Sequence, residues 1–181
     1  MKRCLLLIDV QKGFVSAETE YAVERIEGLL RRKLPGRYPD AAVPDGTVFD
    51  EMIATQFVNA ENSPFRRFIG WNKLSGPPET DVLGFVRENA DRVFVKNVYS
   101  AVNDELLSYL EEKEMAEVFL AGIDTDCCVL KTAADLFERN IDAKVLAYYT
   151  ASNGGRGNRY AAIRVLKRMI GAGQIIRDKH F

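Results

Sequence analysis

Histidine is nearly absent from this 181-residue chain, whose only one is His180, next to the C-terminus. A Ser-His-Asp triad, a Cys-His dyad and a zinc site of the HExxH type all need histidine in the body of the fold. Because terminal residues tend to fray, we assign no role to His180. Any catalysis is therefore expected to use carboxylates, lysine and cysteine.

Cysteine and long apolar runs are also scarce. The three cysteines, Cys4, Cys127 and Cys128, are odd in number and form no CxxC pair, which argues against a disulfide framework and against a metal knuckle. Free thiols are typical of a reducing compartment. Asp9 interrupts the apolar run 4–8 too early for a signal peptide, and no run approaches the roughly 20 apolar residues of a membrane span. The sequence predicts a cytoplasmic protein without a membrane partner.

An excess of charge of one sign is missing as well, since 25 Lys and Arg stand against 26 Asp and Glu. A net charge of −1 predicts no whole-molecule attraction to nucleic acid. The basic and aromatic segment 65–71 is only a weak signal for RNA. Core or subunit packing explains this segment as well as a place in a substrate pocket does. The Gly-rich run 153–158 does not follow a first strand, so a dinucleotide site is not expected, and the run is expected to form a flexible edge of the pocket. The length predicts one domain, residues 1–181.

Short apolar runs alternate with stretches of helical period along the chain. The runs 4–8, 52–57, 92–97, 117–122 and 143–148 predict strands, with 175–176 as a candidate sixth. Helices are expected from Ala22 to the stop at Pro35-Gly36, after Thr80, after Asn103, over 126–139 and over 158–170. Loops are expected over 34–47, 58–79 and 153–157, and the long loop 58–79 leaves room for one helical turn. This alternation predicts an α/β fold with three layers, helices on both faces of a mostly parallel sheet.

Three chemically useful groups follow predicted strands. Asp9 ends the first strand, Lys96 ends the third, and the two adjacent cysteines come just after the fourth, at the start of a helix. The carboxyl ends of parallel strands share one edge of the sheet, where ligands bind. A helix N-terminus and a lysine are expected to lower a thiol pKa, and a carboxylate can take the thiol proton. Each residue alone more often caps a turn, carries a solvated charge or fills a core.

The stretches LLLIDVQKGF (5–14), VFVKNVYSA (93–101) and AGIDTDCCVLKTAADLF (121–137) resemble the three signature regions of the isochorismatase-like cysteine hydrolases. This superfamily includes nicotinamidases, N-carbamoylsarcosine amidohydrolases and isochorismatases. The order and spacing match over nearly the whole chain. The resemblance implies a six-stranded parallel sheet of Rossmann-like topology and a triad of Asp9, Lys96 and Cys128.

The resemblance also distinguishes the two adjacent cysteines. The nucleophile in the family pattern directly precedes valine, which selects Cys128 and leaves Cys127 in the variable position. The family places a cis peptide just before this turn, here Ile123–Asp124. That bond would turn the N–H of Asp124 toward the oxyanion hole that it shares with the N–H of Cys128.

One departure from the family pattern concerns metal binding. Nicotinamidases bind a metal through an Asp-x-His…His arrangement after the second strand, whereas the corresponding segment 55–62 reads TQFVNAEN, without histidine. No metal or other cofactor is therefore expected, and nicotinamidase activity comes into question. We expect a metal-independent hydrolase that cleaves a small amide or related C–N bond through a thioester. Two alternatives stay open: vinyl ether hydrolysis by Asp9 without the thiol, and a non-catalytic protein that binds a metabolite or partner.

The substrate pocket is expected to be aromatic. Its predicted lining consists of residues that follow strand ends or lie in the loop 58–79: Phe14, Phe57, Arg66, Trp71 and Tyr99. The expected partner is a small-molecule substrate. The family resemblance also suggests a homodimer or homotetramer, with the loop 58–79 reaching a neighbouring subunit.

Overall fold

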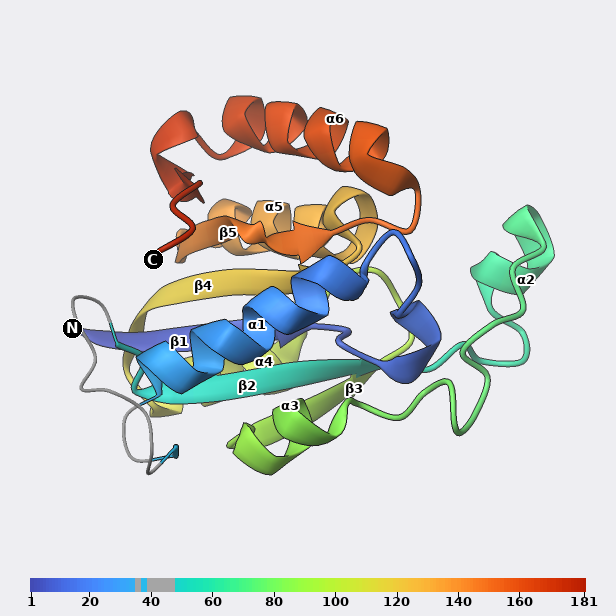
Figure 1. The fold of residues 1–181 in the computed structure, drawn as a ribbon, viewed down its shortest axis with the longest axis horizontal. Coiled ribbons are helices and arrows are strands. Elements are labelled where there is room, and N and C mark those ends of the chain that lie inside the picture. Colours follow the sequence, from blue (N-terminus) through green and yellow to red (C-terminus); the bar gives the residue numbers. More distant parts are fainter. Residues whose placement is uncertain (35–36, 39–47) are drawn as a thin grey trace.

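Six parallel strands form the central sheet of the computed structural model, which describes residues 1–34, 37–38 and 48–181 (Figure 1). Across the sheet the order is β3-β2-β1-β4-β5-β6, and every neighbouring pair is parallel. The strands are β1 (Lys2–Ile8), β2 (Glu51–Phe57), β3 (Arg92–Lys96), β4 (Met115–Ile123), β5 (Asp142–Ala151) and β6 (Ile175–Ile176). The predicted α/β class with a six-stranded, mostly parallel sheet is confirmed.

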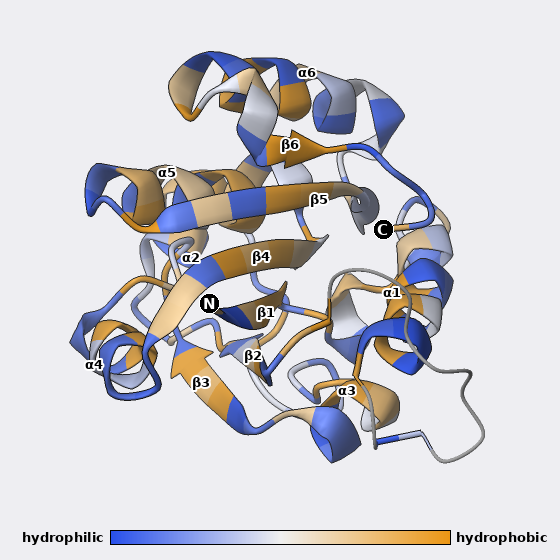
Figure 2. Cartoon of the chain, turned by 90° about the vertical axis from the view of Figure 1, so that its left-hand side faces the viewer, coloured by the Kyte–Doolittle hydropathy of each residue, from blue (hydrophilic) through white to orange (hydrophobic). Residues whose placement is uncertain are grey.

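Helices cover both faces of this sheet (Figure 2). One face carries α1 (Glu20–Lys33) and α3 (Gly84–Asn89), and the other carries α4 (Asp104–Glu112), α5 (Leu130–Glu138) and α6 (Gly155–Met169). Short 3₁₀ turns occupy Lys12–Phe14 and Ala172–Gln174, and a π-helical turn, Thr125–Val129, precedes α5. Within the described ranges, no helix has the length and apolar character that crossing a bilayer requires.

The side chains of β1 explain why its sequence is a continuous apolar run. Successive side chains of a strand point to opposite faces. Cys4, Leu6 and Ile8 pack into the core beneath α4, α5 and α6, whereas Leu5 and Leu7 pack beneath α1 and α3. All five are fully buried, because β1 lies between β2 and β4 with helices on both sides. Both core layers therefore meet at this strand.

The segment 58–79 is a long connection with one short helical element, as the sequence indicates. This helix, α2 (Pro64–Ile69), projects beyond the carboxyl ends of the strands (Figure 1). Ser63 caps α2 by accepting a hydrogen bond from the Arg66 N–H, and Gly70 ends it in the left-handed conformation. In contrast, α6 already begins at Gly155, inside the stretch expected to be a loop. Most of the predicted loop 34–47 lies outside the described residues.

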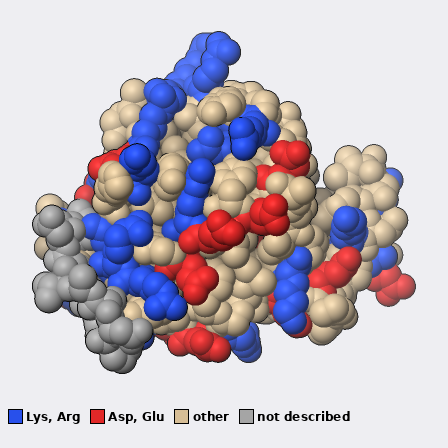
Figure 3. Space-filling view, viewed as in Figure 1, with Lys and Arg blue, Asp and Glu red and all other residues tan. Residues whose placement is uncertain are grey.

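Both signs of charge occur on the face that α1 covers. Figure 3 shows lysine and arginine side chains next to aspartate and glutamate there. The even charge balance of the sequence is thus also mixed in space on this face. The candidate site is therefore the edge formed by the carboxyl ends of the strands, where parallel sheets bind ligands, and not a charged surface.

Candidate active site

Strands β1, β3 and β4 bring their carboxyl ends to one edge of the sheet. Asp9 follows β1 directly and takes a left-handed conformation, with φ 50°, which aspartate tolerates better than most residues. Lys96 is the last residue of β3. Gly122, near the end of β4, pairs with Ile8 and has φ 121°. The end of β4 therefore lies against the residue that precedes Asp9.

Asp9, Lys96 and Cys128 meet at this edge. The Lys96 ammonium lies 2.7 Å from Asp9 Oδ2 and donates a hydrogen bond to Cys128 Sγ at 3.4 Å. It also donates to the carbonyls of Val98 and Tyr99, at 3.0 and 3.1 Å. The exposed fractions of Asp9, Lys96 and Cys128 are 0%, 6% and 4%. A buried carboxylate and a buried ammonium thus compensate each other directly beside the sulfur.

Thr55 orients the Asp9 carboxylate, a contact that sequence reasoning missed. Its hydroxyl donates to Asp9 Oδ1 at 2.6 Å and accepts from the Asp9 N–H at 3.0 Å. Thr55 lies inside β2 and is almost fully buried. A threonine in a buried strand gives no signal in the sequence that separates it from a core residue.

The electrostatics of Cys128 differ from the sequence-based expectation. Burial raises the pKa of its thiol well above the usual value, and the charge of Asp9 and a hydrogen bond with it raise the pKa further; Lys96 lowers it, but by less. Cys128 lies in the π-helical turn before α5, and at 4% exposure the loss of hydration outweighs the favourable helix terminus. The resting pair is therefore a neutral thiol beside a carboxylate.

Lys96 remains an ammonium in this site. Burial lowers its pKa, but the charges of Asp9 and Cys128 and the hydrogen bonds with them raise it by more, so the net direction is upward. Its ring contact is with Phe57, whose centroid lies 5.1 Å from Nζ. The positive charge is thus fixed between the carboxylate and the sulfur at neutral pH.

The backbone turn that contains Cys128 follows the end of β4 directly. The Ile123–Asp124 peptide bond is cis. The N–H groups of Cys127 and Val129 both donate to the Asp124 carbonyl, at 3.2 and 3.1 Å. Among the turn, loop and cap hydrogen bonds of the described residues, none is donated by the N–H of Asp124. An oxyanion hole requires backbone donors of this kind that are free to bind a developing negative charge.

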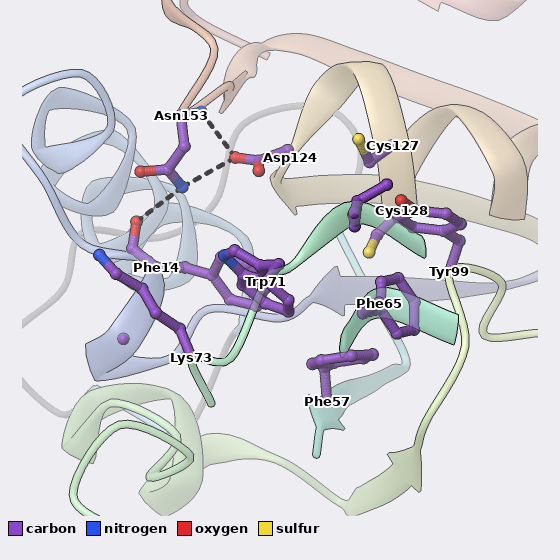
Figure 4. A pocket seen from close by; sticks show the side chains of 12 residues that line it. Phe14, Phe57, Phe65, Trp71, Lys73, Tyr99, Asp124, Cys127, Cys128 and Asn153 are labelled. Carbon is purple, nitrogen blue, oxygen red and sulfur yellow. Dashed lines mark hydrogen bonds between the residues drawn. The ribbon is translucent and has the colours of Figure 1, made fainter. Parts of the chain in front are cut away.

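A cavity of about 240 Å³ opens in front of the sulfur (Figure 4). Four of the five predicted lining residues, Phe14, Phe57, Trp71 and Tyr99, belong to it. The fifth, Arg66, does not, because its guanidinium turns to donate to Ser75 Oγ. The lining residues that sequence reasoning did not propose for the pocket are Gly13, Phe65, Ile69, Lys73, Asn153 and Cys127.

The aromatic rings of this pocket support one another. Trp71 stacks on Phe14 with centroids 6.1 Å apart, and Phe65 meets the ring of Phe57 edge-on at 5.1 Å. Tyr99 meets Phe65 edge-on at 4.9 Å. Such contacts stabilise a preformed apolar wall. The pocket is therefore suited to a small, flat organic group.

Cys127 differs from Cys128 in its surroundings although both line the pocket. Figure 4 shows the two sulfur atoms pointing in opposite directions. Burial raises the pKa of Cys127 to about 11, helped by the charges of Asp126 and Asp124. In the described structure its sulfur has no hydrogen bond with Lys96, in contrast to Cys128.

Asp124 places a second carboxylate at the pocket. Its Oδ1 accepts hydrogen bonds from the backbone N–H of Asn153 at 2.7 Å and from Asn153 Nδ2 at 3.0 Å (Figure 4). Burial raises the pKa of this carboxyl to about 6; the Asn153 donors oppose the rise, and the charges of Asp126 and Asp9 add to it. The sequence places the run 153–158 at the edge of the pocket but does not single out Asn153 as a partner of Asp124.

The segment after β2 does not fit the metal that the resemblance associates with nicotinamidases. Asn59 is occupied in holding the loop, since its Nδ2 donates to the carbonyls of Trp71 and Lys73 at 2.9 and 3.0 Å, and its Oδ1 accepts from Ser63. In the part of the chain that the structure describes, no three His, Cys, Asp or Glu side chains gather in a way that could hold a metal ion. The described residues after β2 therefore do not fit a metal site of the nicotinamidase kind.

Comparison with known proteins places this chain in a family. A sequence model of the isochorismatase domain matches residues 3–175. The chain belongs to the isochorismatase family. The predicted family and the predicted hydrolase class are thereby confirmed.

Sequence relatives agree with this assignment. Isochorismatase family protein 1A of Dictyostelium discoideum is 30% identical over 90 residues, which cover 49% of this chain and only 42% of the relative. An uncharacterized isochorismatase family protein of Bacillus subtilis, PncA, is 27% identical over 178 residues, covering 89% of this chain and 92% of the relative.

Solved structures share the fold over nearly the whole chain. An isochorismatase-like hydrolase from Alkaliphilus metalliredigens superposes with a TM-score of 0.79 at 19% identity, covering 97% of this chain and 94% of that one. The nicotinamidase/pyrazinamidase PncA from Bacillus subtilis gives a TM-score of 0.77 at 22% identity, covering 98% and 100%.

Proposed function

We propose that this isochorismatase-family hydrolase cleaves a small amide or related C–N bond, with Cys128 as nucleophile, Asp9 as proton carrier and Lys96 as the fixed positive charge. The observation that carries the proposal is the contact of the Lys96 ammonium with both Asp9 and Cys128 at the edge of an aromatic pocket. The nicotinamidase/pyrazinamidase PncA from Bacillus subtilis shares the fold, and an amidase among the structural relatives supports cleavage of a C–N bond.

The first half of the reaction forms a thioester. Asp9 takes the Cys128 proton as the sulfur attacks the carbonyl carbon, and the electron pair of the C=O bond moves to oxygen. The N–H groups of Asp124 and Cys128 hold this oxyanion. When the C=O bond re-forms, the C–N bond breaks and the leaving amine takes the proton from Asp9. A thiol with a raised pKa suits this order, because it loses its proton only as the attack proceeds.

The second half releases the acid. Asp9, ionised again, takes a proton from a water molecule that attacks the thioester carbonyl carbon. The C–S bond breaks, the proton returns to sulfur, and a carboxylic acid leaves. Lys96 stays ammonium throughout and stabilises the negative charge as it passes between Asp9 and the sulfur.

The dimensions of the pocket support a small substrate. About 240 Å³ lies below the usual range of roughly 300–1,000 Å³ for ligand pockets. Its walls are largely aromatic, so the acyl group or the leaving group is expected to be compact and apolar on at least one face. The missing metal ligands after β2 argue for an amide other than the one that a metal-dependent nicotinamidase binds.

The test compares the two adjacent cysteines. A panel of small aromatic amides, ureido compounds and a vinyl ether of the isochorismate type is screened, and intact mass is followed for an acyl group on Cys128. We expect Cys128→Ala to lower kcat/KM by at least about 10³-fold and Cys127→Ala to change it by less than about threefold. Equal losses in both variants contradict the proposal. Vinyl ether turnover that survives Cys128→Ala indicates instead chemistry by Asp9 alone.

A further inference from the structure

The Asp124 side chain carries a charge that nothing in the described ranges neutralises. Asn153 donates twice to Oδ1, whereas no donor among the described residues reaches Oδ2, and no lysine or arginine there forms an ion pair with this carboxylate. Asp9, by contrast, has the Lys96 ammonium at 2.7 Å. The half-buried Asp124 carboxylate therefore faces the pocket with one oxygen open to a ligand.

Holding Asn153 in place does not require a charge. Asparagine at position 124 has the same shape, and its carbonyl oxygen can accept both hydrogen bonds that Asn153 donates. Keeping a carboxylate here instead costs stability, because the group is partly desolvated and lies near Asp126 and Asp9. A structural role alone thus leaves the negative charge unexplained.

The walls around Asp124 favour a positively charged ligand. Aromatic faces attract cations, and Phe14 and Trp71 line the same cavity as Asp124. The titratable groups that face Asp124 are Asp126, bound to Ser152 and Asn158, together with Asp9 and the two cysteines. Lys73 also lines the pocket, but it is exposed and hydrated, so its charge is more strongly screened.

We propose that Asp124 determines specificity by binding an ammonium or other cationic N–H group of the substrate at Oδ2. The preferred substrate class is thus a small aromatic amide or ureido compound that also carries a positive charge. The inference rests on the proposed function for the bond that is cleaved, but the selectivity belongs to the pocket and can be measured by binding alone.

Three probes of similar size separate the effect of charge from that of shape. Benzylamine is a cation at pH 7.5, benzyl alcohol is neutral and benzoate is an anion. Trp71 is the only tryptophan of the chain and lines the pocket, so its fluorescence reports binding. We expect benzylamine to bind about tenfold more tightly than benzyl alcohol, a difference of about 1.4 kcal/mol, and benzoate to bind most weakly.

Two variants with the same change of net charge test whether the preference for benzylamine depends on Asp124 itself. Asp124→Asn is expected to remove the preference for benzylamine, whereas Asp126→Asn is expected to keep it, because Asp126 does not line the pocket. The preference should also disappear as the pH falls below about 6, where Asp124 becomes protonated. Asp126→Asn should move this midpoint to lower pH, since the charge of Asp126 raises the Asp124 pKa.

Several results overturn the inference. They are equal binding of the three probes, tighter binding of benzoate, a preference that survives Asp124→Asn, equal losses in both variants, or no binding of benzylamine at millimolar concentration. None of these depends on turnover. The kinetic comparison of the two cysteines therefore tests the proposed reaction separately from this specificity.

Discussion

At the scale of single residues, the candidate site depends on how the buried Asp9 carboxylate is held. Two buried charges offset their desolvation only when the geometry is good and the remaining lone pairs are satisfied. Lys96 supplies the opposite charge to Oδ2, and the Thr55 hydroxyl supplies a hydrogen bond to Oδ1. The orientation of the Asp9 carboxylate, which accepts a proton in the proposed reaction, is therefore set jointly by an ion pair and by one hydroxyl group.

Thr55→Val tests this positioning role. Valine keeps the shape but removes the bond to the carboxylate and the acceptor for the Asp9 N–H. We expect kcat/KM to fall by about ten- to hundredfold, because the proton acceptor loses its orientation. The free energy of unfolding should fall by about 1–3 kcal/mol, since a buried N–H is left unsatisfied. Steady-state kinetics and urea denaturation measure the two effects.

Thr132→Val is the matched control for Thr55→Val. Thr132 is also fully buried and accepts from a backbone N–H, that of Ala101, at 3.0 Å, but it does not contact Asp9. It should lose similar stability while kcat/KM stays within about threefold of the parent value. If both variants lose activity equally, the role assigned to Thr55 is wrong.

At the scale of elements, the close approach of β1 and β4 brings the two halves of the site together. A Cβ added at Gly122 would lie 2.1 Å from the Ile8 carbonyl oxygen and 2.8 Å from its nitrogen. Both atoms are backbone, so neither can move without shifting a strand. Since Asp9 follows Ile8 and Asp124 follows Ile123, only glycine at position 122 lets these strand ends lie so close.

Gly122→Ala should therefore disturb both stability and the site. The clash and the φ of 121° predict a loss of about 2–4 kcal/mol in the free energy of unfolding, and any protein that still folds should lose most of its activity. Gly157→Ala in α6 is the control, because a Cβ there meets no atom within 4 Å. It should be neutral or stabilise by up to about 1 kcal/mol. Thermal and urea unfolding compare the two, and a mild effect of Gly122→Ala contradicts this account.

The elements also show which features the sequence could predict. Strand ends were predictable, because the apolar run of β1, covered on both faces, stops at Asp9, and the shorter run of the edge strand β3 stops at Lys96. The roles of Thr55 and Asn153 were not, because each depends on which residue faces it across the strand ends. Arg66 was expected at the pocket because it lies in the segment 58–79, but its guanidinium donates a hydrogen bond to Ser75 instead. Contacts made by loops depend on three-dimensional packing that periodicity does not encode.

At the scale of the whole molecule, the oligomeric state stays a prediction. The chain has a mass of 20.4 kDa, so sedimentation equilibrium separates a monomer from the expected homodimer or homotetramer. At the end of α2, the side chain of Phe68 is 75% exposed and that of Ile69 is 64% exposed. Adjacent exposed apolar side chains of this kind are typical of a surface that contacts another protein chain. Ile69 also lines the pocket. A subunit contact at the end of α2 is therefore expected to affect access of the substrate to the pocket.

The free energy of unfolding is expected to depend on whether Asp124 is protonated. Its pKa rises from 3.8 to about 6 in the folded chain, so the folded state binds this proton more tightly than the unfolded state. The stabilising contribution is present below the unfolded value and is lost as the pH rises through about 6. Relative to the parent, Asp124→Asn should therefore gain about 1–3 kcal/mol in the free energy of unfolding between pH 4 and pH 7.5. Urea denaturation of both proteins at a series of pH values measures this difference, and titrations that the two proteins share cancel from it. A difference that does not change with pH, or that shrinks as the pH rises, contradicts the raised pKa of Asp124.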